Sequence, residues 1–81
     1  MMGGYVVNDK DSRAKEIFGD NLRLARKYRC LTMQQVAERL GYARYETYAK
    51  YERGELLPNV ALAKRIADAL GCSLDELTNG L

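Results

Sequence analysis

Basic side chains are concentrated in the middle of this 81-residue chain. Between residues 21 and 54, eight arginines and lysines stand against three glutamates, so this segment carries a net charge of +5 while the whole chain carries +2. A locally basic segment on a nearly neutral chain fits a surface that binds a polyanion. The same charges also fit an ordinary solvated surface, so charge alone does not decide between the two.

The sequence offers few residues for metal binding or catalysis. The chain has no histidine, and Cys30 and Cys72 lack CxxC spacing, so no zinc or other metal site is expected. Both thiols adjoin leucines and are expected to be buried or half-buried in a reducing cytoplasm. Without a paired acidic motif or a phosphate-binding glycine loop, we expect neither an enzyme nor a cofactor.

The basic segment contains two short helical patterns around a glycine. Thr32 precedes an apolar-periodic run and Gln35 follows three residues later, which is the spacing of a capping box. Gly41 supplies the positive φ that a helix end needs, and Gly54 closes the second helix. Two short helices joined by a tight turn predict a helix-turn-helix, whose second helix enters the major groove of DNA.

The rest of the chain is expected to form a small all-α domain that positions these two helices. We expect a flexible tail over residues 1–11, a domain over 12–78 and a short tail over 79–81. A first helix capped by Asp11 or Ser12 would present Ala14, Ile17, Phe18, Leu22, Ala25 and Tyr28 to the core. Further helices are predicted at about 33–40, 44–52, 60–70 and 74–77, which makes five. Gly19 is expected to mark a close helix crossing.

With these helices in order, the sequence resembles the lambda-repressor-like (Cro/repressor, Xre-type) helix-turn-helix family. The match runs from about residue 18 to residue 77, and its motifs are Leu22-x-x-x-Arg26, Leu31-Thr32, Val36-Ala37-x-x-Leu40-Gly41, Tyr48-x-x-Tyr51-Glu52-Arg53-Gly54, Pro58-Asn59 and Ala69-Leu70-Gly71-Cys72-Ser73-Leu74-Asp75-Glu76-Leu77. Three features depart from the family pattern. The turn before Tyr48 is one residue longer, Met33 replaces a common glutamine, and Leu56 and Leu57 replace polar residues.

The resemblance implies which side chains meet DNA. With Tyr48 in the core, the outward residues match the family's base-reading positions, and they are Arg44, Tyr45, Glu46 and Lys50. Phosphate contacts are expected from Gln34, Arg53, Arg29 and Lys27. The alternative places Tyr45 over the core and pairs Glu46 with Lys50.

Two further expectations concern residues behind the second helix of the motif. In the family, the arginine and glutamate equivalent to Arg26 and Glu52 form an ion pair that orients this helix. The alternative is two solvated charges that contribute little. Tyr48 and Tyr51 are expected in the core, although tyrosines can also stack on single-stranded bases.

These observations predict a sequence-specific regulator of double-stranded DNA, of phage, prophage or mobile-element repressor type. We expect a homodimer. Its interface is expected to contain Leu74, Leu77 and Leu81, together with Leu56 and Leu57. The alternative is an antitoxin-like or adaptor module that uses the same fold to bind a protein partner. No membrane-spanning run or signal peptide is present, so we expect a cytoplasmic protein that acts at the nucleoid.

Overall fold

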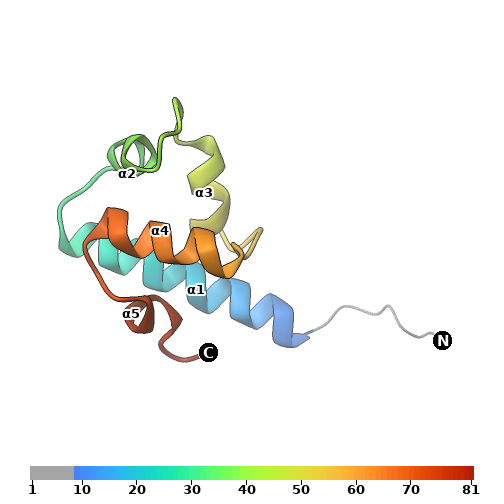
Figure 1. Ribbon diagram of the computed structural model, residues 1–81. Coiled ribbons are helices and arrows are strands. Elements are labelled where there is room, and N and C mark those ends of the chain that lie inside the picture. Colours follow the sequence, from blue (N-terminus) through green and yellow to red (C-terminus); the bar gives the residue numbers. More distant parts are fainter. Residues whose placement is uncertain (1–8) are drawn as a thin grey trace.

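The computed structural model describes residues 9–81, and within this range it contains only helices and their connections. The helices are α1 (Asp9–Tyr28), α2 (Met33–Arg39), α3 (Glu46–Glu52), α4 (Val60–Leu70) and α5 (Leu74–Thr78). In Figure 1, α2 and α3 lie on one side of α1 and α4, and α5 lies on the other side. The contacts follow this arrangement, because α1 packs against α3 and α5 while α4 packs against α2 and α5. The predicted all-α, five-helix fold is confirmed.

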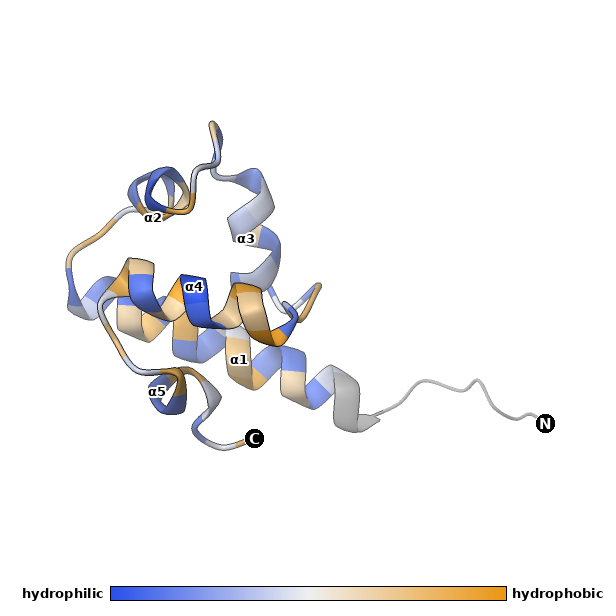
Figure 2. Ribbon diagram, viewed as in Figure 1, coloured by the Kyte–Doolittle hydropathy of each residue, from blue (hydrophilic) through white to orange (hydrophobic). Residues whose placement is uncertain are grey.

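One core joins the five helices. It contains Phe18, Leu22, Ala25, Val36, Ala37, Leu40, Tyr48, Ala63, Ile66, Ala67, Leu70 and Leu77. In Figure 2, α4 is coloured mainly as hydrophobic and α3 mainly as hydrophilic. Helix α4 therefore supplies much of the apolar filling, whereas α3 buries one narrow edge and leaves polar side chains outside.

Side-chain caps begin three of the helices where the sequence predicts them. Thr32 and Gln35 form a complete capping box at α2, and the Asn59 side chain accepts a hydrogen bond from the Leu62 amide at α4. The Ser73 hydroxyl accepts from the Glu76 amide at α5. Because each cap acts within three residues, these starts can be recognised from local sequence alone.

Gly19 lies at a close crossing of α1 and α3. A Cβ atom placed on this residue would lie 2.5 Å from the backbone oxygen of Glu52 and 2.8 Å from that of Tyr51. Both distances are shorter than any ordinary van der Waals contact, so only glycine lets the backbone of α3 approach α1 this closely. The predicted close crossing is confirmed.

Two predicted helix starts are wrong. Helix α1 begins at Asp9, before the expected cap at Asp11 or Ser12, and residues 1–8 of the expected tail lie outside the described residues. Helix α3 begins at Glu46 rather than at Arg44. Tyr45 stands at its N-cap position and makes no side-chain cap hydrogen bond, so the extra residue of the turn is accommodated before the helix.

Two predictions about apolar side chains are also wrong. Tyr28, expected in the core, is 84% exposed because it is the last residue of α1 and lies beyond the packed face. Val60, the first residue of α4, is likewise 77% exposed. Leu77 is fully buried, so it cannot form part of a dimer surface.

Cys30 is exposed, whereas Cys72 is half-buried as predicted. The Cys30 amide donates to the Lys27 carbonyl and the Leu31 amide donates to the Arg26 carbonyl, which ends α1 in a left-handed turn with Cys30 at φ 56°. Chain reversal at this position directs the thiol to the surface. No helix within residues 9–81 is long and apolar enough to cross a membrane.

Candidate nucleic-acid interface

The turn between α2 and α3 is held by backbone and side-chain hydrogen bonds. Gly41 has φ 88°, and the Tyr42 amide donates to the Ala37 carbonyl at 2.9 Å, which closes α2. The side-chain nitrogen of Gln34 donates to the Ala43 carbonyl at 3.0 Å and to the Glu38 carboxylate at 3.0 Å. Gln34, which was predicted to contact phosphate, therefore ties the turn to α2 in the free protein.

Helix α3 has one buried edge and one exposed edge. Tyr48, Ala49 and Glu52 are buried, whereas Thr47 and Lys50 are exposed. Tyr51, expected in the core, is half-buried and packs against it. Counting from the buried residues places Thr47 and Lys50 three apart on the outward edge. Thr47 is absent from the predicted base-reading residues, because the predicted helix began at Arg44 and these residues were placed from that start.

Arg44 and Tyr45 stand in the turn directly before α3, and Tyr45 is 41% exposed. The Arg44 Nε donates to Glu46 Oε1 at 3.2 Å, and its Nη2 donates to Glu46 Oε2 at 3.1 Å. This hydrogen-bonded contact lowers the pKa of Glu46 and raises that of Arg44. Glu46 thus pairs with Arg44 rather than with Lys50, because Arg44 lies outside the helix and folds back over its first residue.

A buried ion pair holds the far end of α3 against α1. The Arg26 Nε lies 2.6 Å from Glu52 Oε2, and its Nη2 donates to Glu52 Oε1 at 3.1 Å. The third nitrogen of Arg26 donates to the Leu31 carbonyl at 2.9 Å. The side chains of Arg26 and Glu52 are 12% and 4% exposed, so the pair lies inside the protein where the resemblance implies it.

Tyr48 lies beside this pair. Its hydroxyl is buried and has no hydrogen-bond partner among residues 9–81. Burial raises the pKa of Tyr48 well above its usual value, and the Glu52 carboxylate adds to the rise. The inner edge of α3 is therefore fixed by an aromatic ring and an ion pair at once.

This arrangement of two helices around a glycine turn agrees with the comparison of the chain with known families. The helix-turn-helix family model matches residues 22–77. The chain belongs to the lambda-repressor-like helix-turn-helix family. The matched range contains all of α2, α3 and α4, together with the Arg26–Glu52 pair.

Three curated relatives of this helix-turn-helix chain are named as regulators. It is 38% identical to YqaE, an uncharacterized HTH-type transcriptional regulator of Bacillus subtilis, over 79% of this chain and 54% of the relative. It is 42% identical to RstR, the cryptic phage CTXphi transcriptional repressor of Vibrio cholerae, over 68% of this chain and 50% of the relative. It is 33% identical to YonR, an SPbeta prophage-derived uncharacterized HTH-type transcriptional regulator of B. subtilis, over 79% of this chain and 58% of the relative. The chain thus spans about half the length of these relatives, and no solved structure matches it.

The predicted phosphate-contacting residues of this family member occupy different surroundings. Arg53 is exposed after α3 and donates to the Glu55 carboxylate at 2.6 Å. Arg29 donates to the carbonyls of Ala25 and Gly71 and lies 3.5 Å from Glu76, so it joins α1 to the turn between α4 and α5. The long-range contact with Gly71 has no signal in local sequence.

The positive charge of residues 21–54 is spread over the helix-turn-helix domain. Arg26 is neutralised inside it, Arg23 pairs with Asp20, and Arg39 donates to the Ala69 carbonyl. Lys50 is exposed and belongs to none of the ion pairs found within residues 9–81. The local charge of +5 therefore does not form one face, and Lys50 is the exposed lysine on the outward edge of α3.

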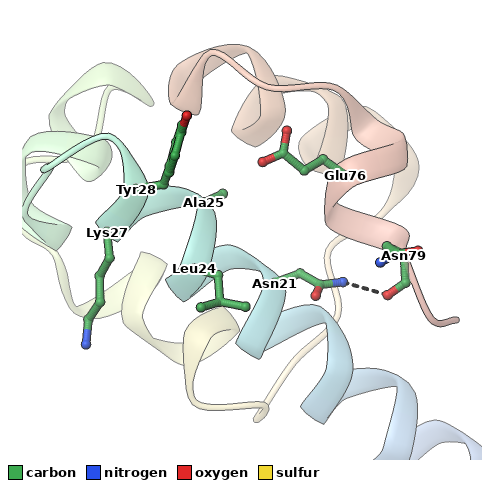
Figure 3. Close-up of a pocket in the computed structure, with 7 residues that line it drawn as sticks. All are labelled: Asn21, Leu24, Ala25, Lys27, Tyr28, Glu76 and Asn79. Carbon is green, nitrogen blue, oxygen red and sulfur yellow. Dashed lines mark hydrogen bonds between the residues drawn. The ribbon is translucent and has the colours of Figure 1, made fainter.

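A hollow of about 600 Å³ between α1 and α5 is separate from the helix-turn-helix. It is lined by Asn21, Leu24, Ala25, Lys27, Tyr28, Glu76 and Asn79. Figure 3 shows the Asn21 amide directed at Asn79, whereas Lys27 extends away from Glu76. Asn21 also donates to the Leu77 carbonyl at 2.8 Å, so this residue fixes the end of α5 on α1.

Proposed function

We propose that this chain is a sequence-specific regulator of transcription that reads the major groove of double-stranded DNA with α3. One observation carries the proposal: α3 leaves a polar edge exposed while its opposite edge is fixed by Tyr48 and the Arg26–Glu52 pair. A recognition helix needs both properties, because its side chains must reach base edges from a defined position. The names of the relatives as regulators and a repressor support the same function.

The base contacts in this proposal come from the turn and the first two turns of α3. Arg44 donates to guanine, Thr47 contacts a base edge or a thymine methyl group, and Lys50 donates to a base from the next helical turn. Tyr45 packs at the edge of the groove. These residues are all exposed and lie within seven positions of one another, two in the turn before α3 and two on the helix, so this short segment can bring them to one site.

Contacts with the phosphates position the protein without specifying the sequence. Arg53 is the best placed of the predicted residues, because it is exposed directly after α3 and opening its pair with Glu55 frees a guanidinium. Lys27 is exposed and extends from the end of α1. Removing one phosphate contact is expected to reduce the salt slope of binding by about one unit.

The regulator is proposed to act as a homodimer at the nucleoid, since one small domain touches only a half-site. An apolar groove of about 220 Å³ offers the dimer surface. It is lined by Phe18, Leu57, Pro58, Val60, Ala63, Leu74, Thr78 and Leu81, of which Leu57, Val60 and Leu81 are exposed. A second copy would cover these three side chains, which otherwise remain in water.

Light scattering over a range of concentrations tests the dimer. We expect Val60→Glu to shift the protein toward the monomer, whereas Leu24→Glu, which changes an exposed leucine of α1 outside the groove, leaves the association unchanged. A wild-type protein that is monomeric at every concentration contradicts this part of the proposal. Such a monomer, joined to salt-insensitive binding of a partner protein in place of DNA, would favour the antitoxin-like or adaptor function.

The central experiment is a selection of binding sites from random duplex DNA, followed by salt titration of the enriched site. We expect a two-fold motif, and we expect Arg44→Ala/Lys50→Ala to lose it. The matched control is Arg13→Ala/Lys64→Ala, which removes one exposed arginine and one exposed lysine outside α2 and α3. Failure to enrich any motif, or equal binding by the two double variants, would refute the base-reading assignment.

A further inference from the structure

The contact between Arg44 and Glu46 uses one side of the arginine head group. Nε and Nη2 donate to the two carboxylate oxygens, at 3.2 and 3.1 Å. A guanidinium is planar and has five N–H donors, so this contact leaves the edge formed by Nη1 and Nη2 free. The free edge still offers two parallel donors. Two such donors are what the O6 and N7 acceptors of guanine require.

Both neighbours of Arg44 are fixed by other contacts. On one side, the Ala43 carbonyl accepts a hydrogen bond from the side chain of Gln34, which belongs to α2. On the other side, the Tyr45 carbonyl accepts the hydrogen bond of the Ala49 amide at 2.9 Å, within α3. The backbone at Arg44 is therefore held between the two helices, while its side chain is 80% exposed and is steadied by Glu46.

We propose that Glu46 is a positioning residue that holds Arg44 ready to read a guanine, and that Glu46 does not itself read a base. This inference rests on the proposed function. Without Glu46, Arg44 would have to give up the freedom of an exposed, flexible side chain when it binds DNA. With Glu46, part of that ordering is complete in the free protein, which increases affinity for the matching base.

The charge of Glu46 agrees with this role. A free carboxylate beside DNA would be repelled by the phosphates, but a carboxylate paired with Arg44 forms a neutral unit that meets less repulsion. Among the ion pairs within residues 9–81, Arg44 is the partner of Glu46, and Lys50 is not. The Arg44 hydrogen bond also lowers the pKa of Glu46, which is the direction expected when an arginine stabilises the ionised carboxylate.

The test is a double-mutant cycle on base preference at the selected site, with wild type, Arg44→Ala, Glu46→Ala and the double variant. Each variant is measured on the site and on its single-base substitutions at one salt concentration, so that changes in phosphate attraction cancel. Arg44→Ala is expected to lose about 5- to 150-fold of the preference for one guanine. Glu46→Ala is expected to lose about 2- to 13-fold at that same guanine, and to have no further effect in the Arg44→Ala background.

Glu46→Gln separates the two possible roles of the side chain. A glutamine keeps one acceptor for Arg44, so the preferred guanine is expected to remain with weaker discrimination. If Glu46 reads a cytosine instead, the glutamine is expected to change that position toward adenine, which is the base that glutamine pairs with in the major groove. Glu55→Ala is the matched control, because it removes the carboxylate of the other exposed arginine pair near α3 and should leave base preference unchanged.

The outcomes distinguish this inference from the function beneath it. Additive effects in the cycle, or a change from cytosine to adenine in Glu46→Gln, overturn the positioning role while leaving a DNA-reading protein. A wild-type protein that enriches no motif overturns the proposed function and this inference together. Far-UV circular dichroism and thermal unfolding of each variant confirm that it is folded, and a loss of fold alone would not be confined to one base position.

Discussion

Replacing Arg26 by methionine tests whether the ion pair with Glu52 holds the fold. The change removes three hydrogen bonds and leaves the Glu52 carboxylate, 4% exposed, without its cation. Breaking one partner of a buried pair costs about 3–5 kcal/mol. A domain of this size loses about 4–8 °C of melting temperature per kcal/mol. We therefore expect Arg26→Met to lower the melting temperature by at least about 12 °C, measured by circular dichroism and by urea unfolding at 25 °C.

The chain contains a matched control for this experiment. Arg53 and Glu55 also place Nε 2.6 Å from Oε2, but their side chains are 53% and 49% exposed. Water screens an exposed pair, so Arg53→Met should leave the stability nearly unchanged. The double variant Arg26→Met/Glu52→Leu should recover most of the loss, because apolar side chains can replace a buried pair. A loss below about 1 kcal/mol in Arg26→Met would refute the reasoning.

Three further changes test other parts of the scaffold. Gly19→Ala should destabilise the protein by about 1–2 kcal/mol, since overpacking against the backbone oxygens of Tyr51 and Glu52 exceeds the gain in helix propensity; a more stable variant in urea unfolding would contradict the close crossing. Asn59→Ala should cost about 1 kcal/mol through loss of the α4 cap, and unchanged thermal unfolding would count against that cap. Tyr48→Phe should be neutral or stabilising at pH 7, because the hydroxyl has no hydrogen-bond partner within residues 9–81. Because the pKa of Tyr48 is raised, the folded protein disfavours the ionised form of this side chain. The stability of the wild-type protein is therefore expected to decline as the pH rises above the unfolded pKa of about 10, and the phenylalanine variant should lose less stability at high pH.

The sequence predicts best where the determining contact is local. The starts of α2, α4 and α5 depend on side-chain caps at Thr32, Asn59 and Ser73, each of which acts on an amide three residues away. The start of α3 has no such signal, because Tyr45 makes no side-chain cap hydrogen bond. Its predicted start was therefore two residues early, and the predicted base-reading residues did not include Thr47.

Contacts between residues far apart in the sequence could not be predicted from the spacing of residues along the chain. Arg26 and Glu52 are 26 residues apart, and only the family resemblance indicated that they meet. Arg29 lies in the same basic run, but its donors turn toward Gly71, 42 residues away. A run of charges does not show which of its members will find a partner inside the protein, so the basic segment did not predict that Arg26 and Arg29 make internal contacts.

Helix α3 owes its position to the residues behind it. Seven residues are too few for a helix to be stable alone in water, and this helix also lacks a side-chain cap. Tyr48, the Arg26–Glu52 pair and the close approach at Gly19 supply the missing stability from the buried edge. The residues that hold α3 in place and the residues proposed to read DNA are therefore separate sets of side chains on one short helix.

That separation leads to a last prediction about Thr47 and Lys50. Both are exposed and outside the core, and surface changes of this kind usually alter stability by less than about 0.5 kcal/mol. Thr47→Ala and Lys50→Gln should therefore change the selected DNA motif while leaving urea unfolding unchanged. If these substitutions destabilised the domain as strongly as Arg26→Met, the outward edge would be part of the scaffold, and new specificity could not arise there without loss of the fold.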